Sequence, residues 1–388
     1  MKTDILQVDP SRIGEITTSA TTDSPLDNWD IKWAVGTPDL ENLQRAATEL
    51  RTTSIPVAFP TETVYGLGAD ATRSAAVRGI FQAKKRPVDN PLIVHFYSLQ
   101  QLRTLLQPTD GEDPIPAIYK PLIQKFWPGP LTIILPNPAG SVLAPEVTAG
   151  LQTFGARMPR SLLALCLIKL AGVPLAAPSA NASTRPSPTA AEHVKDDLDG
   201  RIQTILDGGP CEVGVESTVV DGLSSPPSIL RPGGITLEQL RQCPGWENVV
   251  VGYKDKPEQG IQPRAPGMKY RHYSPKATVA LYEAGAGQPD LATMLGYVGR
   301  TSRIGIIRTK LWKPACGLPV LDGSKNIEIW EIDLGAATAG VARGLFSALR
   351  ELDKHNVDAI FVEGVDDTEG DIATAVMNRL RKAAEVRI

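Results

Sequence analysis

The sequence predicts an α/β protein with two domains. Short apolar stretches alternate with helical patterns between residues 35 and 244, and a second pattern of the same kind runs from 277 to 388. The intervening segment, 245–276, is rich in Gly, Pro and charge and has little periodicity. The chain has 388 residues, so each domain is long enough to bury a core of its own.

Residues 1–34 are predicted to form an N-terminal arm. Between residues 11 and 28 the chain is rich in Ser, Thr, Asp and Pro. Such a composition is typical of a loose or adaptable segment, because it offers little apolar surface to bury.

Helices and strands alternate through the first domain, 35–244. The spacing of apolar residues predicts helices over 39–50 and 75–85, the second with Val77, Ile80 and Phe81 on one face. Apolar runs predict strands over 55–59, 91–96, 131–135, 153–158, 175–178, 204–206 and 217–221.

The second domain, 277–388, repeats this alternation on a smaller scale. A helix is predicted over 338–354, with Val341, Leu345, Leu349 and Leu352 on one stripe, and a final helix over 372–384. Strands are predicted over 277–282, 303–307 and 358–362. This order indicates a small doubly wound sheet with helices on both faces.

Composition excludes several classes of function. The net charge of −3 argues against a surface built to bind duplex nucleic acid. Four cysteines lack CxxC spacing, four histidines lack metal-ligand spacing, and no GxxxxGK[ST], HExxH or GxSxG motif occurs. No apolar run approaches the ~18 residues of a membrane span. The first 30 residues carry two basic and six acidic side chains, unlike a secretory or transit peptide, so we expect a cytoplasmic protein with reduced thiols.

Two polar runs accompany predicted strands in the first half of the chain. PTETVYGLG, 60–68, follows the first strand, where open α/β sheets bind ligands; alternatively it is a turn capped by Thr61 and Thr63. AKKRPVDNPLIVH, 83–95, carries Lys84, Lys85, Arg86 and Asn90 in a loop stiffened by prolines. Such a loop suits a polyphosphate, although cations after a helix also serve as dipole partners.

Three more runs follow. Arg157, in FGARMPR, lies within a predicted strand and is either an anion clamp or an edge arginine that reaches solvent. LAAPSANASTRPSPT, 175–189, lets backbone amides approach an anion, or is an ordinary Ser/Pro-rich loop. GVESTVVD and ILRPGG add Ser217, Thr218 and Arg231, which alternatively decorate core strands. The segment PGMKYRHYSP, 266–275, is either a spacer or a segment that contacts a ligand.

Taken together, these motifs are specific. In this order they closely resemble the YrdC-like domain of threonylcarbamoyl-AMP synthases, a family marked by a KxR pair and an SxN pair. Here the pairs are Lys84 with Arg86 and Ser179 with Asn181. PGMKYRHYSP and the C-terminal VEGV and AVMNRLRKAA resemble the two-domain form, so the resemblance covers residues 35–388. The family usually continues Arg-x-Pro with x-His-Pro, whereas Arg160-Ser161-Leu162 stands here, so no role is carried onto Arg160.

The resemblance implies a fold and an activity. The fold would be a YrdC-like twisted open α/β sheet, followed by a smaller Rossmann-like doubly wound α/β domain. The activity would be synthesis of L-threonylcarbamoyl-adenylate from L-threonine, bicarbonate and ATP with release of pyrophosphate, the first step of N6-threonylcarbamoyladenosine (t6A37) formation in tRNA. Mg²⁺ would accompany ATP, and a downstream threonylcarbamoyl-transferase complex would act on tRNA. Direct binding of tRNA is not predicted.

The resemblance also implies roles for single residues. Lys84 and Arg86 would act electrostatically, because two anions must be brought together and no covalent nucleophile is needed. No protein side chain would bind the metal. Tyr270, with His272 as a further candidate, would make the linker 245–276 a lid that excludes water. L-Threonine would be bound by Thr63, His95, Arg157, Ala177 and Ser217. ATP would be bound by Lys84, Arg86, Asn90, Thr153, Ser179, Asn181, Ser187, Arg231 and Tyr270.

Two other functions are alternatives for this sequence. An RNA-binding module without catalysis is the main alternative, but the acidic pI of about 5.9 and the lack of aromatic stacking motifs count against it. Carbamoyl transfer in hydrogenase maturation uses a related domain, but the chain lacks the zinc-finger cysteines and the length for the extra domains of that protein.

Overall fold

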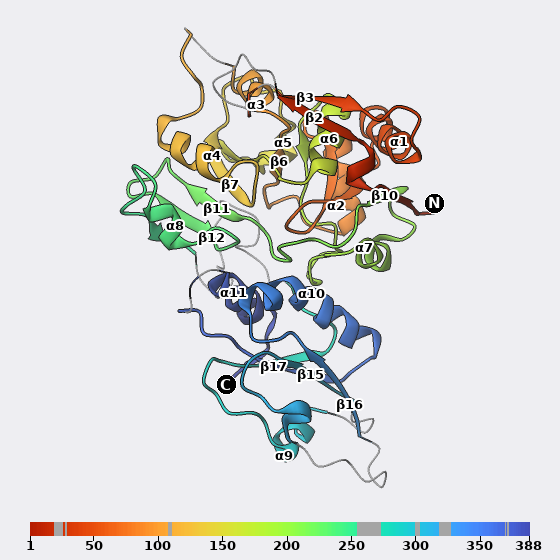
Figure 1. Cartoon of the computed structure of the whole chain (residues 1–388), viewed down its shortest axis with the longest axis vertical. Helices are drawn as coiled ribbons and strands as arrows, with labels where there is room; N and C mark the ends of the chain where they lie inside the picture. Colours follow the sequence, from red (N-terminus) through yellow and green to blue (C-terminus); the bar gives the residue numbers. More distant parts are fainter. Residues whose placement is uncertain are drawn as a thin grey trace.

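The computed structural model describes residues 1–18, 26–27, 29–107, 111–253, 273–298, 303–317, 327–368, 370 and 372–388. The chain forms two α/β units, each built on its own sheet, that lie one above the other along the long axis (Figure 1). The predicted fold class, a large α/β sheet followed by a smaller one, is confirmed.

The larger sheet is mixed and, among the described residues, has eleven strands in the order β1-β10-β4-β5-β9-β6-β8-β7-β11-β12-β13. At its centre β6 runs parallel to β8, whereas β9 runs antiparallel to both β5 and β6. The strands are β1 (Asp4–Gln7), β4 (Val57–Pro60), β5 (Tyr65–Asp70), β6 (Ile93–His95), β7 (Leu131–Pro136), β8 (Thr153–Arg157), β9 (Leu175–Ala176), β10 (Thr204–Asp207), β11 (Thr218–Asp221), β12 (Ser228–Arg231) and β13 (Val250–Val251).

Helices cover this sheet in neighbouring pairs: α1 packs beside α6, and α2 beside α5. Helix α1 begins where the side chain of Thr37 accepts a hydrogen bond from the backbone N–H of Leu40, and Pro38 occupies the first turn, which needs no amide donor. The helices of this unit are α1 (Pro38–Thr52), α2 (Ser74–Lys84), α3 (Leu99–Leu106), α4 (Lys120–Phe126), α5 (Pro145–Thr148), α6 (Leu162–Ala171), α7 (Ala191–Leu198) and α8 (Leu237–Arg241).

The described part of the predicted N-terminal arm is folded rather than loose. Strand β1 extends the edge of the large sheet by pairing in parallel with β10. Strand β2 (Gly14–Thr18) pairs antiparallel with β3 (Trp29–Trp33), and Ile13, Trp29 and Ile31 belong to the main core. The apolar residues at the two ends of the polar stretch therefore order this segment by packing into the core, despite its polar composition.

The run PTETVYGLG contains both a turn and a strand that was not predicted. Thr61 Oγ1 accepts hydrogen bonds from the backbone N–H groups of Thr63 and Val64, as in the turn that was the alternative interpretation. Tyr65–Asp70 then returns as β5, antiparallel to β4. Two glycines in YGLGAD obscured the strand, since glycine disfavours strands in general. Here Gly66 and Gly68 face the ring of Phe59.

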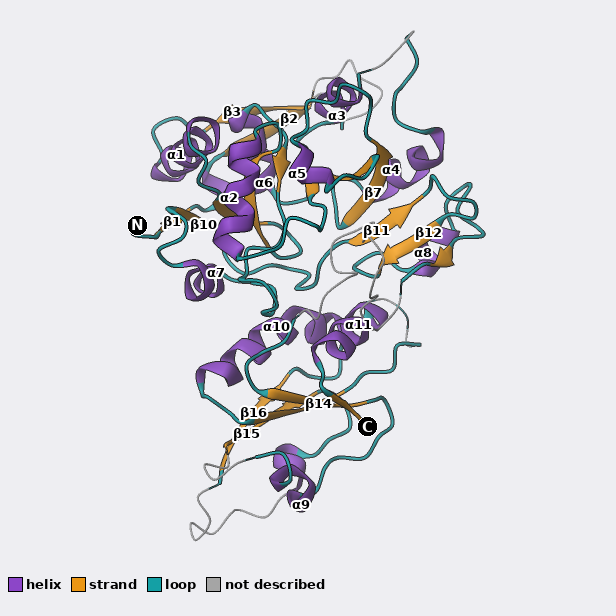
Figure 2. Cartoon of the chain, turned by 180° about the vertical axis from the view of Figure 1, so that it is seen from behind, coloured by secondary structure: helices purple, strands orange, loops and turns teal. Residues whose placement is uncertain are grey.

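The smaller sheet is parallel throughout, in the order β16-β15-β17-β14-β18. Its strands are β14 (Thr278–Tyr282), β15 (Arg303–Arg308), β16 (Glu328–Asp333), β17 (Ala359–Glu363) and β18 (Val386–Arg387). Helices α10 (Thr338–Lys354) and α11 (Ala373–Ala383) lie on the face toward the larger unit, and α9 (Leu291–Leu295) lies on the opposite face (Figure 2). The predicted doubly wound arrangement and both long helices are confirmed.

The two units share one hydrophobic cluster. Val64 and Val215 from the larger unit pack with Val341 and Phe346 of α10. Tyr273, at the end of the connecting segment, stacks on Phe346 with ring centroids 5.2 Å apart. The C-terminal unit is therefore anchored beside the turn that follows β4 and the segment that precedes β11.

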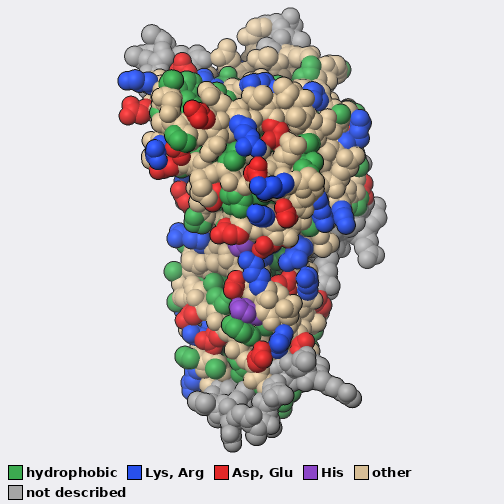
Figure 3. Space-filling model, turned by 90° about the vertical axis from the view of Figure 1, so that its right-hand side faces the viewer, with side chains coloured by type: hydrophobic (Ala, Val, Ile, Leu, Met, Phe, Trp, Pro, Cys, Tyr) green, Lys and Arg blue, Asp and Glu red, His purple; other side chains and the backbone are tan. Residues whose placement is uncertain are grey.

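Within the described residues, none of the helices is long and apolar enough to cross a membrane. All four cysteines are free and buried. Figure 3 shows acidic and basic side chains mixed over one face of the molecule rather than gathered into a single basic stripe.

Candidate functional site

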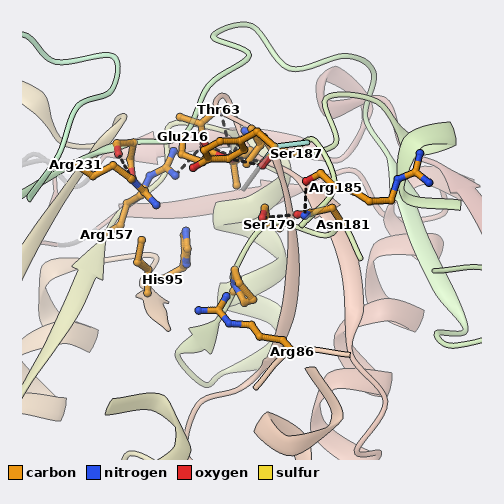
Figure 4. Close-up of a pocket in the computed structure, with 18 residues that line it drawn as sticks. Thr63, Arg86, His95, Arg157, Ser179, Asn181, Arg185, Ser187, Glu216 and Arg231 are labelled. Carbon is orange, nitrogen blue, oxygen red and sulfur yellow. Dashed lines mark hydrogen bonds between the residues drawn. The ribbon is translucent and has the colours of Figure 1, made fainter. Parts of the chain in front are cut away.

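A cavity lies in the larger unit, beside the contact with the C-terminal unit, with about 670 Å³ of space between its walls that includes the part open to solvent (Figure 4). Its walls come from segments far apart in the sequence. They comprise Thr61, Thr63, Val64, Gly66, Arg86, Ile93, His95, Arg157, Ala177, Pro178, Ser179, Asn181, Arg185, Ser187, Glu216, Ser217, Arg231 and Tyr273.

The strand register brings His95 and Arg157 together at one end of the cavity. Parallel strands β6 and β8 end side by side, and their last residues, His95 and Arg157, are register partners. Ala177, the residue after the antiparallel strand β9, also lines the cavity, and its N–H donates to the carbonyl of Ile93 at the start of β6. Three predicted threonine ligands are thus placed by the neighbouring strands β9, β6 and β8.

Arg157 is held in a fixed orientation. Its Nη2 lies 2.7 Å from Oε1 of Glu62, its Nη1 donates to Thr63 Oγ1 at 2.9 Å, and its Nε donates to the carbonyl of Gly129 at 3.2 Å. Arg157 and Glu62 are both 4% exposed, so the charge of each is balanced inside the protein. Of the two interpretations of Arg157, the buried, cavity-lining arginine is the one observed.

His95 is a buried neutral imidazole. Burial, followed by the positive charge of Arg157, lowers its pKa to about 3. Its Nδ1 has no hydrogen-bond partner although the residue is only 3% exposed. A buried polar atom without a partner is costly, so this nitrogen is a ready contact for a ligand in the cavity.

Ser217 and Arg231 form a second polar group on the wall. Arg231 donates from Nε to the carbonyl of Ser217 and from Nη2 to its hydroxyl, both at 3.1 Å. Ser217 also shares a hydrogen bond of 2.8 Å with Thr132. Burial lowers the pKa of Arg231 to about 10, so its guanidinium keeps its charge at neutral pH.

Lys84 supports the SxN loop from the side that faces away from the cavity. The Nζ of Lys84 donates to the carbonyl oxygens of Ser179 and Asn181, each at 2.5 Å, and to Asn181 Oδ1 at 3.3 Å. The Ser179 hydroxyl donates to Asn181 Oδ1 at 2.6 Å. Ser179 and Asn181 line the cavity, whereas Lys84 lies behind their loop and does not.

Arg86 lines the cavity and also closes its own loop. Its Nη2 donates to the carbonyl oxygens of Asn90 and Pro91 at 3.2 Å each. Asn90 is buried under this loop, and Thr153 lies at the start of β8; neither belongs to the cavity wall. The predicted site residues that do line it are Thr63, Arg86, His95, Arg157, Ala177, Ser179, Asn181, Ser187, Ser217 and Arg231.

Several lining residues were not predicted. Arg185 follows the SxN pair and is flanked by the carboxylates of Asp197 and Asp353. Glu216 accepts a hydrogen bond of 2.5 Å from the hydroxyl of Ser187. Both lie inside motifs quoted above, so their sequence signal was their place beside predicted ligands. Tyr273 lines the cavity as well, whereas the predicted lid residues Tyr270 and His272 lie outside the described part of the chain.

The fold and the cavity define an α/β protein with a polar cavity, lined by buried arginines, hydroxyls and a neutral imidazole, a lining that suits a small anionic ligand. Residues 52–233 match the family described as "Telomere recombination", and residues 235–385 match the family described as "Threonylcarbamoyl-AMP synthase, C-terminal domain". The chain belongs to the threonylcarbamoyl-AMP synthase family, in its two-domain form.

Relatives resemble the chain over most of its length. It is 49% identical over 369 residues to the threonylcarbamoyl-AMP synthase of Schizosaccharomyces pombe, covering 89% of this chain and 88% of the relative. It is 46% identical to that of Bacillus subtilis, covering 89% and 94%. The crystal structure of Pyrococcus abyssi Sua5 complexed with L-threonine superposes with a TM-score of 0.75 at 40% identity, covering 89% of this chain and 96% of that one.

Proposed function

We propose that this chain makes L-threonylcarbamoyl-adenylate from L-threonine, bicarbonate and ATP, releasing pyrophosphate. Membership of the family supports the proposal, as does the L-threonine complex of the Pyrococcus abyssi relative. The observation that carries it is the division of one cavity into two polar halves. Arg157, His95 and Thr63 lie in one half, and the SxN loop with Arg86 lies in the other.

The first half suits an α-amino acid with a hydroxyl group. Arg157 offers guanidinium N–H groups to the carboxylate of the amino acid, and Glu62 and Thr63 keep that guanidinium in place. The unpartnered Nδ1 of His95 and the hydroxyl of Ser217 provide further polar contacts for the amine and the side chain. We assign threonine to Thr63, His95, Arg157, Ala177 and Ser217.

The second half suits a nucleotide. Its proposed ligands are Arg86, the Ser179–Asn181 pair and Ser187, with Lys84 and Asn90 supporting the two loops from behind. Arg231, which is hydrogen-bonded to Ser217, would reach the phosphates from the first half. Thr153 lies further off, at the start of β8, and Tyr270 would complete the site from the linker. Arg86 and Arg231 would offset the negative charge of the phosphates.

The proposed reaction has two steps that need no protein nucleophile. The amine of threonine combines with bicarbonate to form a carbamate and water. A carbamate oxygen then attacks the α-phosphorus of ATP, and the bond to pyrophosphate breaks. Both reactants are anions, so the arginines act by cancelling repulsion and by holding the attacking oxygen in line.

Mg²⁺ is proposed to enter with ATP. Glu62, which holds Arg157, and Glu216, on the cavity wall, are each paired with an arginine. Within the described residues, no cluster of three or more His, Cys, Asp or Glu side chains could hold a metal ion. We propose that the phosphate oxygens supply the ligands, and that the ion stabilises the leaving pyrophosphate.

The product is an unstable mixed anhydride, so a transferase complex must accept it and pass the threonylcarbamoyl group to tRNA. We propose this first step of t6A37 formation, in the cytoplasm, as the role of the chain. The free, buried state of all four cysteines suits a reducing compartment.

One assay tests the proposal: pyrophosphate release from ATP by the purified chain, with L-threonine and bicarbonate each omitted in turn. Release is expected only when both are present with Mg²⁺, and L-serine, which lacks the methyl group, should support less of it. Release that does not depend on threonine would contradict the proposal. Salt-dependent tRNA retention without ATP consumption would favour the RNA-binding alternative instead.

A further inference from the structure

A buried arginine of the C-terminal unit reaches the wall of the cavity. Arg379, on α11, is 0% exposed, and its Nε lies 3.0 Å from Oε2 of Glu216. Its Nη1 donates to the carbonyl of Pro232 at 2.5 Å. One side chain therefore ties α11 to the segment before β11 and to the loop after β12, although it lies 163 residues from Glu216 in the sequence.

Glu216 connects the two halves of the cavity. Its Oε1 accepts the hydrogen bond from Ser187, which belongs to the nucleotide half. It directly precedes Ser217, which belongs to the threonine half. The other charged or titratable groups that face this carboxylate are Arg231 from β12, Lys84 from α2 and Tyr273 from the end of the linker.

The charge of Glu216 depends on the arginines around it. Burial alone would raise its pKa, but Arg379 first and Arg231 second outweigh burial and lower the pKa below the usual value. The carboxylate is therefore ionised at neutral pH, and it lines a cavity proposed to receive a triphosphate. Without a compensating cation, that negative charge would repel the phosphates in a poorly hydrated site.

We propose that Arg379 is a positioning residue of the adenylating site: it neutralises Glu216, so that Glu216 can orient Ser187 without repelling ATP. This inference rests on the proposed function, because it takes ATP as the ligand beside Ser187. It gives the C-terminal unit a defined part in the reaction. The larger unit supplies the residues that touch the substrates. Helix α11 supplies Arg379, whose positive charge allows Glu216 to lie beside a nucleotide.

The proposal predicts an unusual dependence on pH. In Arg379→Met, Glu216 loses its main partner, so burial should raise its pKa into the range where it titrates. At high pH the carboxylate would be charged and would repel ATP, and at lower pH it would be protonated and neutral. The Kd for ATP of the variant, relative to wild type at the same pH, should therefore fall as pH is lowered from about 8 to about 6.

Calorimetric titration with ATP·Mg²⁺, in the absence of threonine, measures this without turnover. Arg379→Met should raise the Kd for ATP at least about tenfold at pH 8, which corresponds to roughly 1.4 kcal/mol. The double variant Arg379→Met/Glu216→Gln, in which both charges are absent, should return to within about threefold of wild type and lose the pH dependence. The Kd for ATP of Arg379→Lys, which keeps the positive charge, should lie between those of wild type and Arg379→Met.

Arg381→Met is the matched control. It lies on the same helix, pairs with Glu283 and Asp367 inside the C-terminal unit and does not line the cavity, so ATP binding should be unchanged. Wild-type ATP affinity in a folded Arg379→Met variant would overturn the proposal. If that variant does not fold, the double variant decides: a raised Kd despite neutral partners would also overturn it.

These outcomes are separate from those of the pyrophosphate assay. A wild-type chain that binds ATP but does not consume it with threonine would contradict the proposed function, while the effect of Arg379 on ATP binding would stand. A wild-type chain that does not bind ATP at all would overturn both.

Discussion

The ammonium of Lys84 lies 2.5 Å from the main-chain oxygens of both Ser179 and Asn181. It therefore links the KxR and SxN motifs, although Lys84 and Ser179 are 95 residues apart in the sequence. Lys84 is 2% exposed and lies behind the cavity wall. Lys84 therefore shapes the Ser179–Asn181 loop, and in the proposed function it would affect the nucleotide through that loop.

Replacing Lys84 should therefore affect stability as well as nucleotide binding. Lys84→Met leaves two carbonyl oxygens buried without their donor, so the free energy of unfolding should fall by roughly 3 kcal/mol. ATP affinity should fall with it. Urea denaturation and calorimetry measure the two effects. Lys85→Met, at the exposed neighbouring position, is the control and should change neither; wild-type stability of Lys84→Met would contradict this role.

Arg157 is expected to need its planar guanidinium, not only its charge. Its three nitrogens contact Gly129, Thr63 and Glu62, a geometry that a lysine ammonium cannot reproduce. Arg157→Lys should weaken L-threonine binding about tenfold or more, with a smaller effect on ATP. Arg160→Lys, at an exposed arginine paired with the exposed Glu212, should bind threonine as wild type does. Equal threonine affinities of the two variants would count against the clamp.

Thr184, in the loop that follows Asn181, carries backbone strain. Its φ is +76°, a region that β-branched residues rarely adopt, and its carbonyl accepts a hydrogen bond from the N–H of Ser274 in the linker. Thr184→Gly should relieve this strain and raise the free energy of unfolding by about 1 kcal/mol, after allowing for the greater entropy of unfolded glycine. Thr184→Val, which keeps the branched side chain, should show no gain. A loss of stability in the glycine variant would refute the strain.

His95 should make the fold sensitive to acid. Its pKa is about 3 in the folded protein against 6.5 in a model peptide. Between these values the unfolded chain binds a proton that the folded chain does not, so stability falls as the pH is lowered through this window. The contribution has a slope of up to about 1.4 kcal/mol per pH unit. His95→Gln should flatten the profile of unfolding free energy between about pH 6 and about pH 4; an unchanged slope would show that His95 is not the titrating group.

Sequence reasoning was most successful where structure is local. The predicted helix over 338–354 coincides with α10, and the strands over 131–135 and 204–206 lie within β7 and β10, because the periodicity of apolar residues acts over a few residues. It missed β5, whose glycines are compatible with a strand only because Phe59 packs against them. It also underestimated the N-terminal segment, whose β2–β3 pairing depends on residues at its two ends.

The sequence by itself determined the family and most of the cavity wall. The ordered motifs named ten residues that line the cavity, among them Arg157, Ser179 and Ser217. Only the tertiary structure decided what charges surround them. Glu62 lies 95 residues from Arg157, and Glu216 lies 163 residues from Arg379. A local sequence pattern cannot predict such a pair, because the two residues are far apart in the sequence. They form a buried ion pair only where the packing of the chain brings them together away from water. The assignment of Arg379 to the site therefore required the packed domains.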